Sequence, residues 1–302
     1  MNVLYLTDTH LGIRQHFRGA PANWTRAQDH LEAFQQALAA EVAPSGAPID
    51  AVIHSGDVFD RSKPPPEAIH AAVEAFTAVA RRVPVFLIPG NHDGLGLVRH
   101  FAGIPGLTVG DSAFSTRIGG ALVGFMPHHR SAEEWACAAT KLVKQSGACD
   151  VLVAHQAFDG AAVRGHSFSA GAEPDTIGAR HLPACVRTVL SGHIHPRQTR
   201  GLGSATVIYP GSTERTAFSE RSETKGYAVI EFGATIQAHF IDLVSRPMTE
   251  VYVERDLEKV GPGHLVRLAR TVRTVEAEAV AIQRGGYVVP WKEESKQIAL
   301  FD

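Results

Sequence analysis

The chain has 302 residues, of which 44% are apolar and 20% charged, with a formal net charge of −2. This balance is typical of a folded globular protein and argues against extensive disorder, while the near-neutral charge neither favours nor excludes a nucleic-acid partner. No apolar run approaches the roughly 20 residues needed to cross a bilayer, and the first ten residues do not resemble a secretory signal. We therefore expect a cytoplasmic protein without a membrane anchor.

Five short apolar runs in the first two thirds of the sequence each stop at a polar cluster. The runs cover residues 3–6, 51–53, 85–88, 151–153 and 186–190. Apolar residues occupy both faces of each run, which predicts strands in the interior of a sheet. The clusters that follow them are Asp8-Thr9-His10, Gly56-Asp57, Gly90-Asn91-His92-Asp93, His155 and Gly192-His193-Ile194-His195.

Helical spacing separates these runs. Apolar residues three or four apart predict two helices, marked by Leu31, Phe34, Leu38 and Val42 and by Ile69, Val73, Phe76 and Val79. Pro64 to Pro66 form a turn and helix start, and Ser131 to Glu134 resemble a capping box before a third helix. The alternation of strands and helices predicts an α/β fold. In such folds binding sites form beyond the carboxyl ends of the strands, so the five clusters can converge.

The character of the sequence changes near residue 206. Runs at 207–209, 227–232, 236–241 and 249–253 predict successive strands of a meander that closes the same core. Beyond them, an apolar stripe flanked by arginines predicts an amphipathic helix over 265–282, ended by Gly285-Gly286. Covering the sheet edge is its favoured role, and docking a partner or DNA is the alternative. Cys137, Cys149 and Cys185 are too few and too scattered for disulfides or a zinc ribbon, so we expect buried free thiols.

The five clusters contain ligands for two divalent cations. Imidazole, carboxylate and amide groups without cysteine suit Mn²⁺, Fe²⁺ or Zn²⁺ better than soft metals, and Asp57 is the candidate bridging carboxylate. His92, beside a ligand, is the candidate proton donor because imidazole titrates near neutral pH. One cation would take Asp8, His10, Asp57 and His195, and the other Asp57, Asn91, His155 and His193.

Each motif taken singly has an ordinary structural explanation, since Gly, Asn and Asp favour turns. For His54, one residue away from its cluster, we favour a core histidine. Five strand ends that all carry compatible ligands are not explained by turn chemistry, so the metal site is the better joint interpretation.

The ordered motifs DTH, GD, GNHD, H and GHIH resemble the calcineurin-like metallophosphoesterase superfamily over roughly residues 1–245. The resemblance implies a central β-sandwich flanked by helices, the same ligand and proton-donor residues, and a metallophosphoesterase (nuclease) domain at 1–245. Residues 246–302 would then be a truncated capping or partner-docking segment. Phosphoprotein phosphatases of this superfamily usually carry Gly and Glu where this sequence has Ser62 and Asp93, which disfavours that class.

A narrower resemblance points to the SbcD nuclease family, the bacterial counterpart of the eukaryotic double-strand-break repair nuclease. The sequences DTHLG at 8–12, GDVFD at 56–60, KPP at 63–65 and YPGST at 209–213 carry it. It implies Mn²⁺-dependent exonuclease and endonuclease activity on DNA in DNA repair, with Mg²⁺ as another candidate ion. It also implies a homodimer and a coiled-coil ATPase partner resembling SbcC, although the short C-terminal segment weakens the case for the ATPase. A cyclic-nucleotide or small-molecule phosphodiesterase on the same site is the alternative, and a non-catalytic DNA-binding protein a weaker one.

Basic and hydroxyl side chains follow several of the motifs on the metal-bearing face. The candidate DNA or phosphate contacts are Arg14, Arg61, Lys63, Ser212, Thr213 and Arg215, with Arg18, Arg197 and Arg200 as further basic residues. Basic loops are usually only solvated. Phe17 and Trp24 could stack on bases, but we favour their packing as loop anchors.

Overall fold

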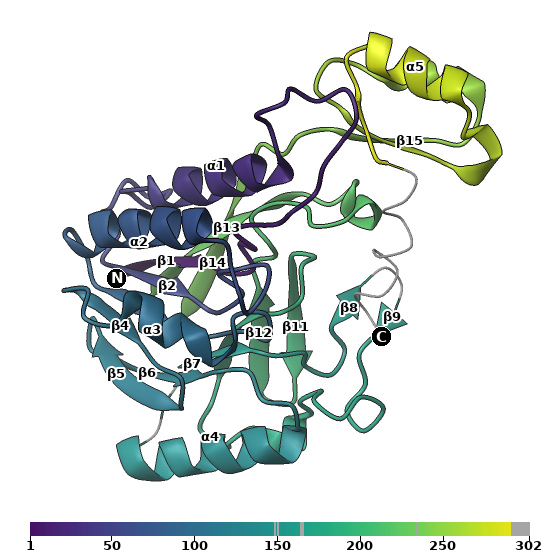
Figure 1. Ribbon diagram of the computed structural model, residues 1–302. Helices are drawn as coiled ribbons and strands as arrows, with labels where there is room; N and C mark the ends of the chain where they lie inside the picture. Colours follow the sequence, from purple (N-terminus) through teal and green to yellow (C-terminus); the bar gives the residue numbers. More distant parts are fainter. Residues whose placement is uncertain (148, 150, 164–165, 234, 291–302) are drawn as a thin grey trace.

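Two six-stranded β-sheets stacked face to face form the centre of the computed structural model (Figure 1), which describes all residues except 148, 150, 164–165, 234 and 291–302. The first sheet contains, in spatial order, β14 (Ile236–Leu243), β13 (Lys225–Phe232), β1 (Asn2–Leu6), β2 (Ala51–His54), β3 (Val85–Leu87) and β4 (Leu107–Val109). The second contains β11 (Gln198–Leu202), β12 (Ala205–Tyr209), β10 (Thr188–Gly192), β7 (Val151–His155), β6 (Ala121–Met126) and β5 (Phe114–Ile118). The expected α/β fold with a central β-sandwich is confirmed.

The inner strands are buried on both faces, as their continuous apolar runs predict. In β1, Leu4 and Leu6 face the helical layer, whereas Val3 and Tyr5 face the opposite sheet. All four side chains are fully buried. Successive residues of a strand point to opposite faces, so one short run contributes to two layers of core.

Helices cover the outer face of each sheet (Figure 1). The first sheet is covered by α1 (Arg26–Leu38), α2 (Pro66–Ala80) and α3 (Leu97–Phe101), and the second by α4 (Ala132–Ser146). The predicted starts are confirmed: α2 begins at Pro66, and the Ser131 hydroxyl accepts a hydrogen bond from the Glu134 N–H. Val42 was wrongly assigned to the first helix. It lies beyond the end of α1 at Leu38 and is 58% exposed.

The strands that precede the polar clusters run parallel within each sheet. In the first sheet β1 pairs with β2 and β2 with β3, and in the second β10 pairs with β7, all in parallel. The carboxyl ends of parallel strands lie at the same edge, so the loops that follow them share that edge. The functional site is built there.

The C-terminal part differs from the prediction. The four strands expected after residue 206 are not one meander, because β12 belongs to the second sheet, β13 and β14 to the first, and β15 (Met248–Val251) to a separate small sheet. That sheet is completed by β16 (Leu265–Leu268) and β17 (Tyr287–Val288). A two-stranded hairpin, β8 (Ala162–Val163) and β9 (His166–Ser167), lies in the long loop after β7.

The predicted helix over 265–282 is wrong in its first half. Residues 265–268 form β16, paired on both sides, and helix α5 covers only Val275–Gln283. The Thr274 hydroxyl caps α5 by accepting a hydrogen bond from the Ala277 N–H. A run of Leu and Val with an alternating arginine satisfies strand and helix spacing alike, and pairing with β15 and β17 decides for the strand. The supposed apolar stripe is also broken, because Val275 is 72% exposed.

The long loop after β1 packs against this C-terminal segment. Phe17 and Trp24 contact each other edge to face with ring centroids 5.8 Å apart, and Trp24 lies 4.9 Å from the Tyr287 ring. The Arg246 guanidinium lies 4.9 Å from the Trp24 ring. Both loop aromatics are thus anchors, as favoured from the sequence.

A buried acid links α1 to the start of the C-terminal segment. The Asp29 carboxylate accepts hydrogen bonds from Arg26 and from two nitrogens of Arg246. Burial alone would raise the pKa of Asp29, but the hydrogen bonds from Arg246 and the charge of Arg26 outweigh it and lower the pKa.

We expect Asp29→Asn to reduce the free energy of unfolding by about 1–3 kcal/mol at pH 7, the usual contribution of charged hydrogen bonds. A depressed folded-state pKa stabilises the protein above the unfolded value near ~3.9, and this stabilisation is lost as the pH falls through the folded value. Urea unfolding from pH 7 to about pH 2 should therefore show a difference that persists down to about pH 4 and then disappears as the two proteins converge. A difference that stays constant with pH would contradict this role for Asp29.

The three cysteines differ in their burial. Cys149 is buried, but Cys137 is exposed and Cys185 is half-buried, so the expectation of three buried thiols was wrong for two of them.

Among the described residues, no helix is both long and apolar enough to span a bilayer. Of the predicted C-terminal segment, 291–302 lie outside the described residues.

Candidate metal centre

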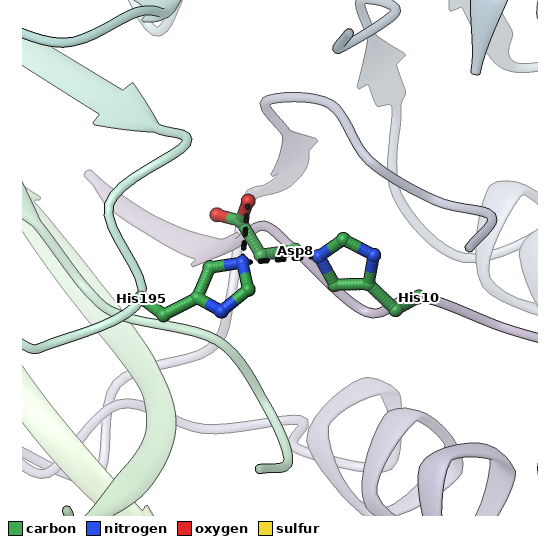
Figure 2. Close-up of side chains that lie close together, drawn as sticks. All are labelled: Asp8, His10 and His195. Carbon is green, nitrogen blue, oxygen red and sulfur yellow. Dashed lines mark hydrogen bonds and ion pairs between the residues drawn. The ribbon is translucent and has the colours of Figure 1, made fainter. Parts of the chain in front are cut away.

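Six of the seven candidate ligands lie in the loops after β1, β2, β3 and β10, and His155 is the last residue of β7. The structure brings all seven together at one edge of the sandwich. On one side of the cluster, the Nε2 atoms of His10 and His195 lie 3.1 Å apart, and the His195 Nε2 lies 3.7 Å from an Asp8 carboxylate oxygen (Figure 2). These three side chains place their ligand atoms within 4.8 Å of one another.

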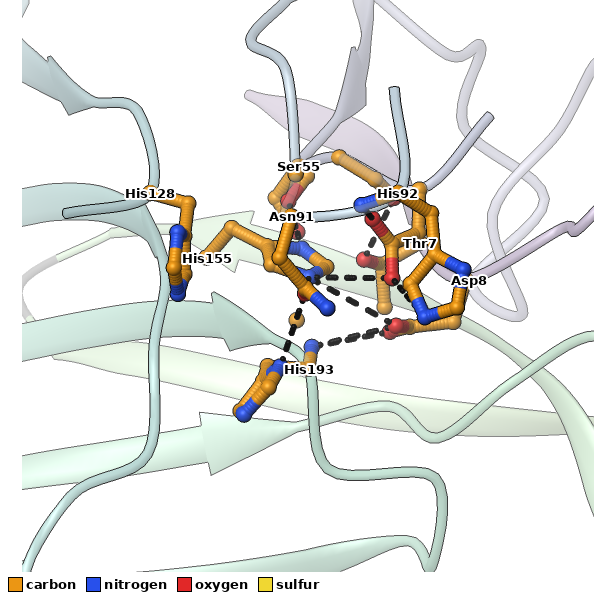
Figure 3. Close-up of polar contacts among 12 residues, drawn as sticks. Thr7, Asp8, Ser55, Asn91, His92, His128, His155 and His193 are labelled. Carbon is orange, nitrogen blue, oxygen red and sulfur yellow. Dashed lines mark hydrogen bonds and ion pairs between the residues drawn. The ribbon is translucent and has the colours of Figure 1, made fainter. Parts of the chain in front are cut away.

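The other side of the cluster contains Asn91, His155 and His193 (Figure 3). The amide oxygen of Asn91 lies 3.1 Å from the His155 Nε2 and 3.0 Å from the His193 Nδ1. An Asp57 carboxylate oxygen lies 3.3 Å from the His155 Nε2 and 3.9 Å from the His10 Nε2. Asp57 therefore faces both sides, which is the position required of a bridging carboxylate.

The backbone at the ligands is held in an unusual conformation. Asp8, His10, Asp57 and His193 have positive φ angles of 52°, 45°, 55° and 81°, and they are the only non-glycine residues in the described part of the chain that do. Such backbone is disfavoured by about 1–3 kcal/mol per residue and persists where the surroundings impose it, often at functional sites. All four residues are predicted ligands.

Backbone hydrogen bonds between the first two ligand loops impose this conformation. The Asp8 N–H donates to the Gly56 carbonyl at 3.0 Å and the His10 N–H to the Asp57 carbonyl at 3.1 Å. The next residue continues the series, from the Leu11 N–H to the Val58 carbonyl at 2.8 Å. The two loops therefore behave as one unit that fixes three ligands.

Gly90 leaves room for the bridging carboxylate. A Cβ atom at this position would clash with the Asp57 carboxylate and lie 2.5 Å from the Asp57 backbone nitrogen. We expect Gly90→Ala to displace Asp57 and to weaken Mn²⁺ binding by about 10–100-fold, the effect typical of disturbing the support of a ligand. Gly201→Ala in β11 is the control, because a Cβ there meets nothing within 4 Å. Equal Mn²⁺ affinity of the two variants in calorimetric titrations would rule out this role for Gly90.

The hydrogen bonds of the histidines fit a cation at the centre. The Nδ1 of His155 lies 2.8 Å from the Ser55 carbonyl oxygen, and the Nδ1 of His195 lies 2.9 Å from a Glu220 carboxylate oxygen. Each Nδ1 must carry its hydrogen to donate there, so in the neutral ring the Nε2 lone pair points into the cluster. Lone pairs of imidazole, carboxylate and amide groups at 3.0–3.9 Å repel one another unless positive charge lies between them.

The pKa values report the same need for positive charge. Burial alone would lower the pKa of His155, but the Asp57 and Asp8 carboxylates outweigh it and raise the pKa to about 9. Burial also tends to raise the pKa of Asp57, but the positive charge of His155 holds it well below its usual range. A proton on His155 thus supplies the charge that a divalent cation would supply in its place.

His92 lies at the edge of the cluster. Its Nδ1 donates to the Asp60 carbonyl oxygen at 2.8 Å, and its Nε2 lies 4.0 Å from an Asp57 oxygen. The side chain is 30% exposed. The ring is therefore anchored through one nitrogen, while the other faces the site and is accessible from solvent.

Some residues that support the site were not identified from the sequence. The Asp93 carboxylate accepts hydrogen bonds from the backbone N–H groups of Gly90, Val58 and Phe59, and so ties the second ligand loop to the third. Burial raises the pKa of Asp93 to about 6, and the Asp57 charge adds to the effect. Glu220, which contacts His195, was also missed, because it follows no strand-end pattern. His54 is the buried core histidine expected from the sequence, hydrogen-bonded to Thr9.

The candidate DNA contacts fall into two groups. Arg14, Arg61 and Lys63 are exposed. Ser212 and Thr213 are fully buried, so their side chains do not reach a phosphate in this structure. The Arg215 guanidinium donates to the carbonyl oxygens of Glu223 and Arg246. The Ser212 hydroxyl donates to the Glu214 carbonyl oxygen, whereas the Thr213 hydroxyl has no hydrogen-bond partner within the described residues, so phosphate binding by this sequence stays a prediction.

The other basic residues differ in their pairing. Arg18 forms an ion pair with Glu278 and Arg197 with Asp242, each at 2.8 Å. Arg200 is exposed and donates to the Gln198 amide oxygen at 3.1 Å.

Comparison with known proteins identifies a family. The calcineurin-like phosphoesterase family matches residues 1–197 of this chain. That segment includes β1 through β10 and all seven candidate ligands.

Curated relatives extend the similarity beyond that segment. The chain is 29% identical over 298 residues to the DNA double-strand break repair protein Mre11 of Haloferax volcanii, covering 93% of this chain and 60% of that protein. The Mre11 protein of Archaeoglobus fulgidus is 26% identical, covering 84% and 62%. A solved archaeal phosphodiesterase matches 80% of this chain and all of its own, at 14% identity and a TM-score of 0.41. The chain thus spans about 60% of the length of the curated relatives it matches.

Proposed function

The chain belongs to the calcineurin-like phosphoesterase family, and from that premise we propose that it is a metal-dependent nuclease that hydrolyses DNA phosphodiesters in DNA repair. The proposal rests above all on the convergence of metal-ligand side chains from five strand ends, with Asp8, Asp57 and His155 placing their ligand atoms within 4.8 Å of one another. The substrate class is supported by the curated relatives, which are named as double-strand break repair proteins.

The site would hold two divalent cations, with Mn²⁺ the first choice and Fe²⁺, Zn²⁺ or Mg²⁺ as alternatives. When bound, the cations supply charge to the phosphate oxygens and lower the pKa of an attacking water. The residues of the chain fix where this occurs. Asp8, His10 and His195 would hold one ion, Asn91, His155 and His193 the other, and Asp57 both.

His92 would donate a proton to the departing oxygen. Its Nδ1–H is held by the Asp60 carbonyl, so the protonated ring would present its Nε2–H to the substrate. The His92 backbone N–H also donates to an Asp57 oxygen at 2.9 Å. The residue that carries the proposed proton donor therefore also fixes the position of the Asp57 carboxylate through its backbone N–H.

Arg14, Arg61 and Lys63 are the exposed cations that would contact the DNA backbone. They belong to the loops that follow β1 and β2, next to the ligands of those loops. Phosphate contacts of this kind make affinity fall as salt rises, without sequence preference.

Membership of this family also leads us to propose a domain division, an oligomeric state and a partner for the chain. We place the nuclease domain at 1–245 and a capping or docking segment after it, supported by the separate core that Val251, Val266 and Val288 form there. We also propose that the chain forms a homodimer and binds an SbcC-like ATPase. The cytoplasmic location predicted from the sequence is likewise a proposal.

The test is a cleavage assay with the purified chain on linear and circular DNA, in Mn²⁺, Mg²⁺ or chelator. We expect hydrolysis with Mn²⁺, loss with chelator and slower cleavage at higher salt. An Asp57→Asn preparation made in parallel excludes a contaminating nuclease. Turnover of cyclic nucleotides without DNA cleavage under any of these metals would favour the alternative phosphodiesterase and refute the nuclease.

A further inference from the structure

We propose that Glu220 is a positioning residue that holds His195 for one of the two cations, with Lys225 neutralising its carboxylate. The inference rests on the proposed metal centre and concerns residues outside its ligand set. Glu220 ends the short 3₁₀ helix Phe218–Glu220, 25 residues after His195. Its side chain is 3% exposed, and the Lys225 side chain is fully buried at the start of β13.

The two carboxylate oxygens of Glu220 have different partners. Oε1 lies 2.9 Å from the His195 Nδ1 and accepts from the Thr216 hydroxyl at 2.8 Å. Oε2 accepts from the Thr216 N–H at 2.9 Å and lies 2.9 Å from the Lys225 ammonium. The carboxylate is thus fixed from the Thr216 side, and the oxygen nearer the site is directed at the imidazole.

This contact determines which nitrogen of His195 faces the cluster. With Nδ1 donating to Glu220, the His195 Nε2 points at Asp8 and His10, as Figure 2 shows. A carboxylate behind an imidazole fixes the tautomer and ring orientation and strengthens nitrogen as a ligand.

Within the described part of the chain, the buried ligand histidines His155 and His10 lack such a partner. The His155 Nδ1 contacts a neutral carbonyl, that of Ser55, and the buried His10 Nδ1 has no hydrogen-bond partner there. Of these three histidines, His195 is the one whose Nδ1 contacts a carboxylate, so we infer that the two cation positions are supported unequally.

Lys225 balances the negative charge of the buried Glu220 carboxylate. A buried carboxylate carries a large desolvation cost, which a well-placed partner of opposite charge offsets. The Lys225 ammonium lies 2.9 Å from Glu220 and 2.8 Å from Glu223. Glu223 thus shares Lys225 with Glu220, whereas the carboxylate that contacts the His195 ring is that of Glu220, so Glu223 serves as a matched control.

The test measures Mn²⁺ binding rather than catalysis. Free Mn²⁺ has a strong electron paramagnetic resonance signal that bound ions lose, so titration of metal-free protein gives the number and affinity of the sites. We expect Glu220→Ala to lower the affinity for one of the two Mn²⁺ ions by about 10–100-fold and to leave the affinity for the other unchanged. Glu220→Gln keeps an oxygen for the His195 N–H and should recover part of the loss. Glu223→Gln should bind both ions like the unaltered chain.

The outcomes separate this inference from the metal centre itself. If the unaltered chain binds two ions and the Glu220 variants bind both equally well, or lose both in parallel with thermal stability, Glu220 is not a positioning residue. If the unaltered chain binds no Mn²⁺ at all, the proposed function fails first. Glu220→Gln, which conserves size, keeps the test decisive where Glu220→Ala does not fold.

Discussion

Replacing Asp57 by asparagine is expected to reduce the rate of DNA cleavage by at least about 10³-fold, because a contribution of several kcal/mol from the cations is lost with their shared ligand. The Asp57 carboxylate lies 3.3 Å from His155 and 3.9 Å from His10, so one change affects both sides of the cluster. Asparagine has nearly the same shape but no charge. Single-turnover cleavage in saturating Mn²⁺, beside a count of bound Mn²⁺, measures the effect.

Two controls make the Asp57 result interpretable. Asp111→Asn makes the same chemical change at an exposed residue between β4 and β5 and should cleave DNA at the unaltered rate. Thermal unfolding without metal measures whether Asp57→Asn is folded, and we expect lower stability than that of the unaltered chain, because His155 loses the carboxylate that balances its positive charge. Full cleavage with two bound ions in the Asp57→Asn protein would refute the bridging role.

The convergence of the five clusters could be predicted because it follows from strand direction alone. A polar residue directly after a buried parallel strand must lie at the carboxyl edge, and β1, β2 and β3 share one such edge. The sequence could not reveal that β7 and β10 belong to a second sheet. That division depends on which faces pack, for example Val3 and Tyr5 of β1 against the other sheet.

The supporting residues could not be predicted, because their partners are distant in sequence and often lie in the backbone. Asp93 was visible in the GNHD cluster, but it binds the N–H groups of Val58, 35 residues away, and of Phe59, 34 residues away. Glu220 lies in an irregular segment without periodicity, and only the folded chain shows that it reaches His195. The burial of Ser212 and Thr213 was not predicted either, nor was the hydrogen bond of the Ser212 hydroxyl to the Glu214 carbonyl oxygen.

Weakly apolar strands were also missed. The hairpin of β5 and β6 turns at Gly119 and Gly120, both with positive φ, and β5 includes polar residues such as Thr116 and Arg117. The mixed polar and apolar sequence of β5 is typical of an edge strand with one solvent-exposed face. From a single sequence, such a strand is hard to distinguish from a loop. The other interior strands were found because burial on both faces leaves a continuous apolar run, but β6, an interior strand with such a run, was missed.

Replacing His92 by alanine should lower the DNA cleavage rate by about 10²–10⁴-fold, the usual contribution of a general acid, while Mn²⁺ binding persists. The His92 Nε2 lies 4.0 Å from an Asp57 oxygen, and we assign this nitrogen to proton donation and not to a cation, so its loss should remove no ligand. The His92 backbone N–H, which bonds Asp57 at 2.9 Å, is unaffected by the change. His70→Ala on the exposed face of α2 is the control for removal of an imidazole.

The leaving group distinguishes proton donation from a positional effect of His92. A p-nitrophenyl phosphodiester releases a stable anion that needs no proton, so its hydrolysis should fall far less than DNA cleavage in the His92→Ala protein. If the ring only held the Asp60 carbonyl or the third ligand loop in place, its loss would slow the hydrolysis of both substrates to the same extent. Equal losses on the two substrates, or loss of bound Mn²⁺, would therefore assign His92 a structural role, whereas a loss confined to DNA assigns the proton to its Nε2.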